Sequence, residues 1–291
     1  MIAHALTIDL EDWHQLLFRR VRGEAGHISA AVVDATHRLL DMLDETGTKA
    51  TFFVMGLLAQ ARPHLVHEVA RRGHEIGSHS HNHHLIYQMT RETFRDEMAA
   101  ARARLQDLTG APVLGFRAPE FSVQRLDHWC FDALAEVGFA YDSSVFPSPA
   151  RYGIPDAPRS PFTIETKSGP IVEFPLASWC VGRRRFAVAG GTYWRLWPRA
   201  MLDRALSDLE DEQVPAVLYF HPYEFHSGFL RLSNLGFFGS LNRHHLKYVL
   251  LHNIFTGRIR ARLRALLRRH EFKPLGQLHA AGAGSTAGRM R

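Results

Sequence analysis

The chain has few cysteines and no long apolar run. Cys130 and Cys180 are the only 2 cysteines among its 291 residues, so it can form no cysteine-based zinc site. Any metal must therefore be held by histidine and carboxylate side chains. The most apolar stretch, residues 50–61, is far shorter than the ~20 residues that a membrane-spanning helix needs. We expect no transmembrane segment.

The first residues also lack the features of a secretory signal peptide. A strand pattern over residues 6–10 begins at once, without a charged leader, an apolar core or a cleavage site. We therefore expect a cytoplasmic protein that meets its substrate in the cytoplasm or at the inner face of the membrane.

The chain has a formal net charge of +6, and its positive charge is concentrated near the C-terminus. Arginines and leucines alternate there in the pattern of a basic amphipathic helix. Such a helix can bind anionic lipid headgroups or an anionic glycan carrier. Alternatively, its leucines pack against the protein and its arginines lie in solvent, and we favour this second interpretation. No groove-reading motif accompanies the arginines, so we expect no nucleic-acid partner. The arginines are Arg258, Arg260, Arg262, Arg264, Arg268 and Arg269.

Strand and helix patterns alternate along most of the chain. A repeated strand–helix unit is typical of a parallel sheet, and at this length of a closed or nearly closed barrel. Strands are predicted over residues 6–10, 50–56, 75–78, 113–116, 139–141 and 216–220. Helices are predicted over residues 31–45, 63–73, 90–110, 126–137 and 198–212.

The region from about residue 147 to 195 breaks this period. Short strands over residues 162–166 and 171–174 flank Ser168-Gly169 and predict a β-hairpin beside the site. We expect one catalytic domain over residues 1–277, with core motifs in 5–225 and a helical C-terminal extension in 241–277. The tail, residues 278–291, is rich in Ala, Gly and Ser and is predicted to be disordered.

A histidine pair follows the third predicted strand. His79 and His83 stand four residues apart, so their imidazoles can close on one metal ion if the segment makes a helical turn. Such a pair alone is more often a solvated turn or two core histidines. His81 and His84 fall on other faces of that turn, and we expect them not to be ligands.

Ionisable residues gather directly after the predicted strands. Barrel enzymes build their sites from the C-terminal ends of parallel strands. Each residue alone has an ordinary explanation, such as a cap or a surface ion pair, but their common register predicts one shared site. The residues are Asp9, Glu11, Asp12, His79, His83, Arg117, Asp142 and His221.

Five motifs that carry these residues resemble, in order, those of the polysaccharide deacetylases, carbohydrate esterase family 4 of the NodB-homology type. The similarity spans residues 5–225, and the segment 152–159 with the arginine-rich region resembles the subgroup found with bacterial exopolysaccharide and exosortase loci. The motifs are Thr7-Ile8-Asp9-Leu10-Glu11-Asp12-Trp13, His79-x-x-x-His83, Arg117-Ala118-Pro119, Tyr141-Asp142-Ser143-Ser144 and Phe220-His221-Pro222-Tyr223-Glu224.

The resemblance implies a distorted TIM-like (β/α)7-type barrel, with the hairpin and C-terminal extension added, that removes acetyl groups from N-acetylated sugars. It implies one divalent metal, most often Zn²⁺ and sometimes Co²⁺ or Ni²⁺. By motif, Asp9 would be the general base, paired with Arg117, and His221 the general acid, oriented by Asp142. The backbone N–H of Glu120 would complete an oxyanion hole.

The first motif departs from the family pattern, in which two aspartates are adjacent. Residues 9 and 11 of an extended strand face the same side, which slightly favours Glu11 as the third metal ligand beside the histidine pair. A bend at Leu10 would bring Asp12 to the metal instead, so both residues stay candidates. Glu120 also stands where many members have Tyr, although only its backbone is needed.

The function expected from these residues is metal-dependent hydrolysis of N-acetyl groups on N-acetylhexosamine units of a bacterial cell-surface polysaccharide or its precursor, through a metal-activated water. Two alternatives are a small-molecule amidohydrolase of the allantoinase type and a non-catalytic glycan-binding protein. A glycoside hydrolase is a weaker alternative, because Asp9 and Glu11 on one strand cannot flank a glycosidic bond from opposite sides. The sequence leaves the oligomeric state open.

Overall fold

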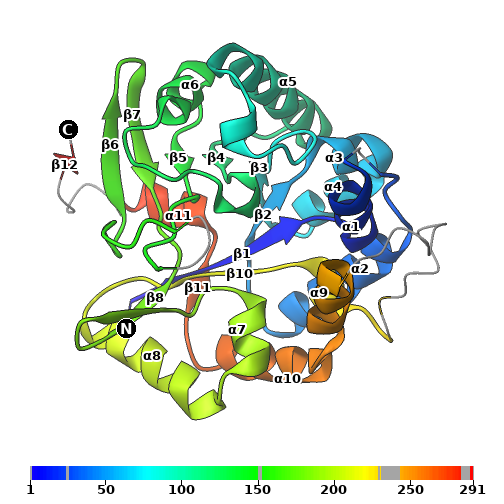
Figure 1. The fold of residues 1–291 in the computed structure, drawn as a ribbon, viewed down its shortest axis with the longest axis vertical. Helices are drawn as coiled ribbons and strands as arrows, with labels where there is room; N and C mark the ends of the chain where they lie inside the picture. Colours follow the sequence, from blue (N-terminus) through cyan, green and yellow to red (C-terminus); the bar gives the residue numbers. More distant parts are fainter. Residues whose placement is uncertain are drawn as a thin grey trace.

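The computed structural model describes residues 2–23, 26–149, 153–228, 230, 243–282 and 289–290. At its centre lies a curled sheet with the strand order β10-β1-β2-β3-β4-β5-β7-β6-β12, parallel except between β6 and β7 (Figure 1). This arrangement confirms the predicted α/β class and barrel-like curl. The strands are β1 (His4–Leu10), β2 (Thr51–Val54), β3 (Glu75–Ser78), β4 (Gly115–Phe116), β5 (Tyr141–Asp142), β6 (Phe162–Thr166), β7 (Gly169–Glu173), β10 (Val217–Phe220) and β12 (Arg289–Met290).

Helices cover the outer side of the curled sheet (Figure 1). The predicted 31–45 helix has the same bounds in the structure. The one after Thr90 begins with that side chain as its N-cap and ends at Gly110, whose φ of 65° suits glycine. The helices are α1 (Trp13–Arg22), α2 (Ala31–Glu45), α3 (Gly56–Ala61), α4 (Pro63–Arg71), α5 (Arg91–Thr109), α6 (Trp129–Val137), α7 (Gly191–Leu196), α8 (Arg199–Asp211), α9 (Arg243–Asn253), α10 (Thr256–Leu267) and α11 (Leu275–Ala280).

β1 lies between β10 and β2 in the sheet and is buried along its whole length. Parallel partners flank it, with β2 paired at Asp9 and Phe53 and β10 paired at Ile8 and Phe220. Alternation along the strand sends Thr7 and Asp9 to one side. The strand thus carries polar side chains through an apolar core to its C-terminal end, where Glu11 follows.

The hairpin predicted around Ser168-Gly169 is present. β6 and β7 pair antiparallel from Phe162–Glu173 to Thr166–Gly169, and Gly169 has a φ of 133° that favours glycine in the turn. A further hairpin, β8 (Ser178–Val181) and β9 (Arg184–Ala187), follows it. Next to it, the Ala177 N–H donates to the Val217 carbonyl on β10. The region therefore contains two hairpins, and their position as a wall beside the site stays a prediction.

The C-terminal segment packs back onto the barrel. α10 buries Ile259, Leu263 and Leu266, as expected for a helix held by its apolar face. Arg260 and Arg262, however, donate to backbone carbonyls of the barrel. Contact with a membrane through this helix stays a prediction. Beyond it, β11 (Phe272–Lys273) pairs with the first residues of β1.

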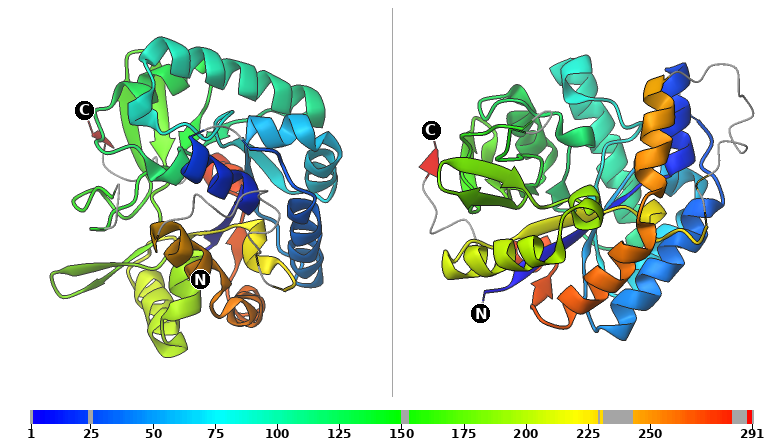
Figure 2. Two further views of the ribbon diagram at one scale, coloured as in Figure 1. Left: turned by 45° about the vertical axis from the view of Figure 1, so that its right-hand side comes forward. Right: turned by 60° about the horizontal axis from the view of Figure 1, so that its bottom comes forward.

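A separate apolar cluster joins α1 and α9, which lie side by side in the right view of Figure 2. Trp13 and Leu17 of α1 pack there with Val249 of α9 and with Tyr223. None of the helices in the described ranges is long and apolar enough to cross a membrane. Half of the tail predicted to be disordered, residues 283–288 and 291, lies outside the described residues.

Candidate active site

The C-terminal ends of the strands open into a cavity of about 790 Å³. Side chains from β1, β10 and the loop after β3 reach it, together with α1 on one side. This location is the one that parallel barrels use for catalysis. Among the residues that line the cavity are Asp9, Glu11, Arg19, His83, Glu120, Tyr219, His221 and Glu224.

Glu11, His79 and His83 form a buried cluster at the floor of the site. Oε1 of Glu11 lies 2.6 Å from Nε2 of His79 and 3.0 Å from Nε2 of His83. Burial alone would raise the pKa of Glu11, but the neighbouring imidazoles of His83 and His79 hold it well below its usual range. Glu11 is therefore ionised, and its ligating oxygen lies close to both imidazoles.

The hydrogen bond behind His79 shows that this cluster suits a cation. Nδ1 of His79 lies 2.9 Å from the Arg117 carbonyl oxygen, which can only accept, so Nδ1 carries a hydrogen. In the neutral ring, Nε2 then points a lone pair at the ionised Glu11 oxygen. Two acceptors this close need a proton or a metal between them. The donor set, two imidazoles and one carboxylate, is one that zinc takes in hydrolytic sites.

Asp12, the other candidate ligand, lies outside this cluster. Its carboxylate caps α1 by accepting the His14 N–H at 3.1 Å, and it also accepts the Ser29 hydroxyl at 3.0 Å. The structure therefore brings Glu11, and not Asp12, to the histidine pair.

The loop that carries the histidine pair is not a helical turn, contrary to the sequence expectation. Ser80 and His83 both have a left-handed backbone, with φ of 60° and 59°. The Ser80 hydroxyl accepts the His83 N–H at 3.0 Å and closes the loop. A left-handed conformation costs a residue other than glycine about 1–2 kcal/mol, and such strain is common where a site fixes its side chains.

Arg117 and Asp9 form the second part of the site. Arg117 is fully buried and donates from one guanidinium nitrogen to Asp9 Oδ1 at 2.8 Å and to the Thr7 hydroxyl at 2.6 Å. The same guanidinium donates to the carbonyl and hydroxyl of Ser143 and lies 4.3 Å from the centre of the Phe53 ring. This set of contacts fixes the Asp9 carboxylate at the edge of the cavity.

The resemblance implied that Asp142 contacts His221, but its carboxylate instead bonds to Ser144. Its two oxygens accept the Ser144 hydroxyl at 2.7 Å and the Ser144 N–H at 2.9 Å. Beside it, burial and the charge of Asp142 raise the pKa of Glu173 well above its usual range. Asp142 belongs to a buried carboxyl pair beneath the site.

His221 lies next to Glu11 in the cavity. Its Nε2 lies 3.8 Å from Glu11 Oε2, and its ring stacks on Tyr223 with 4.6 Å between centroids. Burial lowers the pKa of His221, but Glu224 and the charges of Glu11 and Asp9 outweigh it, so the pKa is raised. The carboxylate next to this imidazole is thus Glu224, whose role the sequence did not predict.

Glu120 lies at the cavity edge with a left-handed backbone, φ 49°, directly after Pro119. Its side chain accepts from Arg20 at 2.9 Å. Its expected role as a backbone N–H donor to an oxyanion stays a prediction.

Arg19 is a site residue that the sequence did not reveal. It comes from α1, an element that our sequence analysis did not predict, and donates to the carbonyl and to Nδ1 of His83. A metal at Nε2 of His83 requires a hydrogen on Nδ1, and Arg19 would then keep only its bond to the carbonyl. The helical spacing of Trp13 and Leu17 was the available signal for α1.

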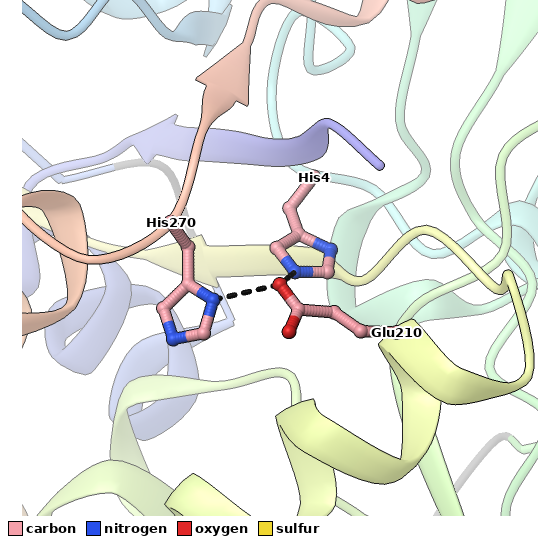
Figure 3. A group of neighbouring side chains, drawn as sticks. All are labelled: His4, Glu210 and His270. Atoms are coloured by element: carbon pink, nitrogen blue, oxygen red, sulfur yellow. Dashed lines mark hydrogen bonds and ion pairs between the residues drawn. The ribbon is translucent and has the colours of Figure 1, made fainter. Parts of the chain in front are cut away.

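A cluster of the same residue types lies at the other end of β1 (Figure 3). Oε1 of Glu210 lies 3.3 Å from Nε2 of His4 and 2.8 Å from Nδ1 of His270. Here, however, the Ala216 N–H donates to Nδ1 of His4 at 3.0 Å. Nε2 of the neutral ring must then carry the hydrogen, so it donates to Glu210 and has no lone pair for a metal.

The fold and the site are those of α/β barrel enzymes that carry a histidine–carboxylate cluster at the C-terminal ends of the strands. Residues 26–139 match the family model of the polysaccharide deacetylases, and residues 143–280 match a domain of unknown function, DUF3473. The deacetylase match covers less than half of the chain, and it identifies residues 26–139 as similar to that family.

Curated relatives match part of the chain. A Bacillus cereus peptidoglycan-N-acetylglucosamine deacetylase is 33% identical over 84 residues, which is 29% of this chain and 39% of the relative. A chitooligosaccharide deacetylase from Sinorhizobium fredii is 36% identical over 85 residues, 29% of this chain and 40% of the relative. The chain thus spans well under half the length of these relatives.

Solved structures share the fold along the whole chain. A Mycobacterium smegmatis protein provisionally assigned as a polysaccharide deacetylase aligns with a TM-score of 0.62 and 20% identity, over 100% of this chain and 94% of its own. A 4-alpha-glucanotransferase from Thermococcus litoralis aligns with a TM-score of 0.59 and 12% identity, over 96% and 40%. At such identities the likeness concerns the fold alone.

Proposed function

We propose that the protein is a metal-dependent N-deacetylase that acts on N-acetylhexosamine units of a bacterial cell-surface polysaccharide or its precursor. The observation that carries the proposal is the buried Glu11–His79–His83 cluster, which lies next to His221 in one cavity and beside the Arg117-bound Asp9. The deacetylase relatives support the reaction class. The finer assignment to an exopolysaccharide rests on the sequence resemblance of residues 152–159.

The three residues of the cluster would hold one divalent ion, with Zn²⁺ first and Co²⁺ or Ni²⁺ as alternatives. When bound, such an ion polarises the acetyl carbonyl and lowers the pKa of a water toward ~7. His79 fits this role best, because the Arg117 carbonyl fixes the hydrogen on Nδ1 and leaves Nε2 to the ion.

Asp9 acts as the general base on the attacking water. Its carboxylate is only 2% exposed, and the guanidinium of Arg117 holds it in place by donating a hydrogen bond. As the water oxygen bonds to the acetyl carbon, Asp9 takes the proton that the water loses. The Glu120 backbone N–H would donate to the oxygen on which negative charge develops.

His221 acts as the general acid. The carbon–nitrogen bond breaks as Nε2 delivers a proton to the sugar nitrogen, so the products are acetate and a free amine. The raised pKa of His221 supports this assignment, because a protonated imidazole is required before the step.

The decisive measurement is acetate release from chitooligosaccharide, peptidoglycan and bacterial exopolysaccharide, with the protein loaded with Zn²⁺ or stripped by a chelator. We expect release only with metal, and a loss of about 100-fold or more for both Asp9→Asn and His221→Ala. Full activity in either variant would overturn the assignment. Turnover of cyclic ureides without acetate release would identify a small-molecule amidohydrolase instead.

A further inference from the structure

The His221 ring has one nitrogen without a hydrogen-bond partner in the described structure. Nε2 points toward Glu11 and the cavity, whereas Nδ1 is buried and makes no hydrogen bond. Oε2 of Glu224 lies 3.7 Å from this nitrogen. A buried donor this close to a carboxylate needs only a small adjustment to form a hydrogen bond.

Glu224 is itself held firmly from the other side. Its Oε2 accepts the backbone N–H of His221 at 3.0 Å, and its Oε1 lies 3.7 Å from a guanidinium nitrogen of Arg195. Both side chains are almost completely buried, with 2% and 1% exposed. Arg195 is anchored in turn by the His252 carbonyl at 3.1 Å and the Thr192 hydroxyl at 3.2 Å.

The backbone of α7 leaves room for this carboxylate. A Cβ atom at Gly191 would lie 2.2 Å from Oε1 and 2.3 Å from Oε2 of Glu224. Any side chain at this position would push Glu224 away from its place beside His221. Glycine is therefore needed at position 191 to make room for the Glu224 side chain. The local backbone does not need it, because Gly191 has no positive φ.

We propose that Glu224 is the positioning residue for His221: its carboxylate accepts a hydrogen bond from Nδ1 and turns Nε2 into the cavity. Arg195 and Gly191 place Glu224, and stacking on Tyr223 fixes the plane of the ring. This role replaces the one that the family resemblance gives to Asp142. It rests on the proposed function, because it presupposes that His221 donates a proton.

The chemistry of the leaving group provides the test. A sugar amine must be protonated to leave, whereas the 4-nitrophenolate of an aryl acetate leaves as an anion without a proton. A defect confined to His221 therefore slows amide cleavage and spares ester cleavage. A general loss of structure or of metal slows both reactions equally.

The test variant is Glu224→Gln, in which one amide oxygen can still accept the His221 N–H while the amide N–H opposes a hydrogen on Nδ1. For the Zn²⁺-loaded full chain, we expect kcat on an N-acetylated chitooligosaccharide to fall about 100-fold and 4-nitrophenyl acetate hydrolysis to change less than about threefold. Glu210→Gln, the same change beside His4 and His270, is the matched control and should leave the ratio of the two rates unchanged. Asp142→Asn should also leave this ratio unchanged.

An unchanged amide-to-ester ratio in Glu224→Gln would overturn the proposal, as would a ratio lowered by Asp142→Asn. If Glu224→Gln fails to fold, Gly191→Ala provides the second variant, and it should lower the same ratio because it displaces the carboxylate. An unchanged ratio there would also count against the proposal. A wild-type protein that cleaves aryl acetate but no N-acetylated glycan would instead refute the proposed function.

Discussion

A cluster of one glutamate and two histidines lies at each end of β1. The two clusters differ in the backbone group that contacts Nδ1 of one histidine. At the C-terminal end, Nδ1 of His79 faces the carbonyl of Arg117, so the hydrogen sits on Nδ1. At the N-terminal end, Nδ1 of His4 faces the N–H of Ala216, so the hydrogen sits on Nε2. His79 therefore presents a lone pair to its glutamate, whereas His4 presents a hydrogen to its own.

This difference shows that residue types and distances alone do not define a metal site. Both glutamates lie within 3.3 Å of two imidazole nitrogens. The backbone group at the far side of the ring decides which tautomer is present, and the tautomer decides whether a metal or a hydrogen fills the centre. The second cluster is therefore a hydrogen-bonded contact between β1, α8 and the segment before β11.

Removal of one histidine from each cluster should produce the largest contrast. His79→Ala should reduce bound Zn²⁺ from one ion per chain to almost none and lower acetate release about 1000-fold, because the metal supplies several kcal/mol of charge stabilisation. His270→Ala should change neither quantity. Zinc stoichiometry after dialysis, measured by atomic emission, checks both variants. Loss of one zinc ion in His270→Ala would show that the second cluster also binds metal.

The two adjacent carboxylates after β1 provide a contrast of intermediate size. Glu11→Gln should weaken Zn²⁺ affinity about 100-fold, since a ligand is lost at the cluster. Asp12→Asn should leave affinity unchanged and lower the free energy of unfolding by about 1 kcal/mol or less, since Asp12 is a helix cap. Competition with a chromogenic chelator and urea unfolding measure the two effects. Weaker zinc binding in Asp12→Asn would make Asp12 the ligand.

Much of the fold was predictable because its signals are local. The bounds of α2 and β3 and the caps of α5 at Thr90 and Gly110 follow from apolar spacing and capping residues that need no distant partner. α1 was missed because its buried face contacts α9 and Tyr223, far away in the chain. A helix whose burial depends on remote segments has a weak signal of its own.

The sequence predicted which residues form the site better than it predicted which of them contact each other. Register after parallel strands predicts that Asp9, His79 and Arg117 share one edge of the sheet, and the structure brings them there. Sequence could not show that Asp142 pairs with Ser144 while Glu224 lies beside His221. That choice depends on side-chain rotamers and on the space at Gly191, which only three-dimensional packing defines.

The last expected effect concerns stability in acid, and it extends the comparison to a third histidine. His74 precedes β3 and accepts the Ala50 N–H at Nδ1, 3.2 Å away, as His4 accepts that of Ala216. Burial, with a smaller contribution from the charge of Lys49, lowers the pKa of His74 to about 4. Burial also lowers the pKa of His4, against the charge of Glu210. Both rings are therefore neutral in the folded protein at neutral pH.

The sign of the pH dependence follows from this neutrality. Between about pH 6.5 and pH 4 the unfolded chain binds a proton at His74 and the folded chain does not, so stability falls as the pH falls. We expect His74 to account for about 3 kcal/mol of this loss, from 1.36 kcal/mol per pKa unit. In His74→Asn, Oδ1 can still accept the Ala50 N–H and nothing titrates. Urea unfolding from pH 7 to pH 4 should therefore show a flatter curve for this variant. An equally steep curve would mean that His74 is protonated in the folded state, and the rule that a backbone N–H fixes the neutral tautomer would fail here and at His4.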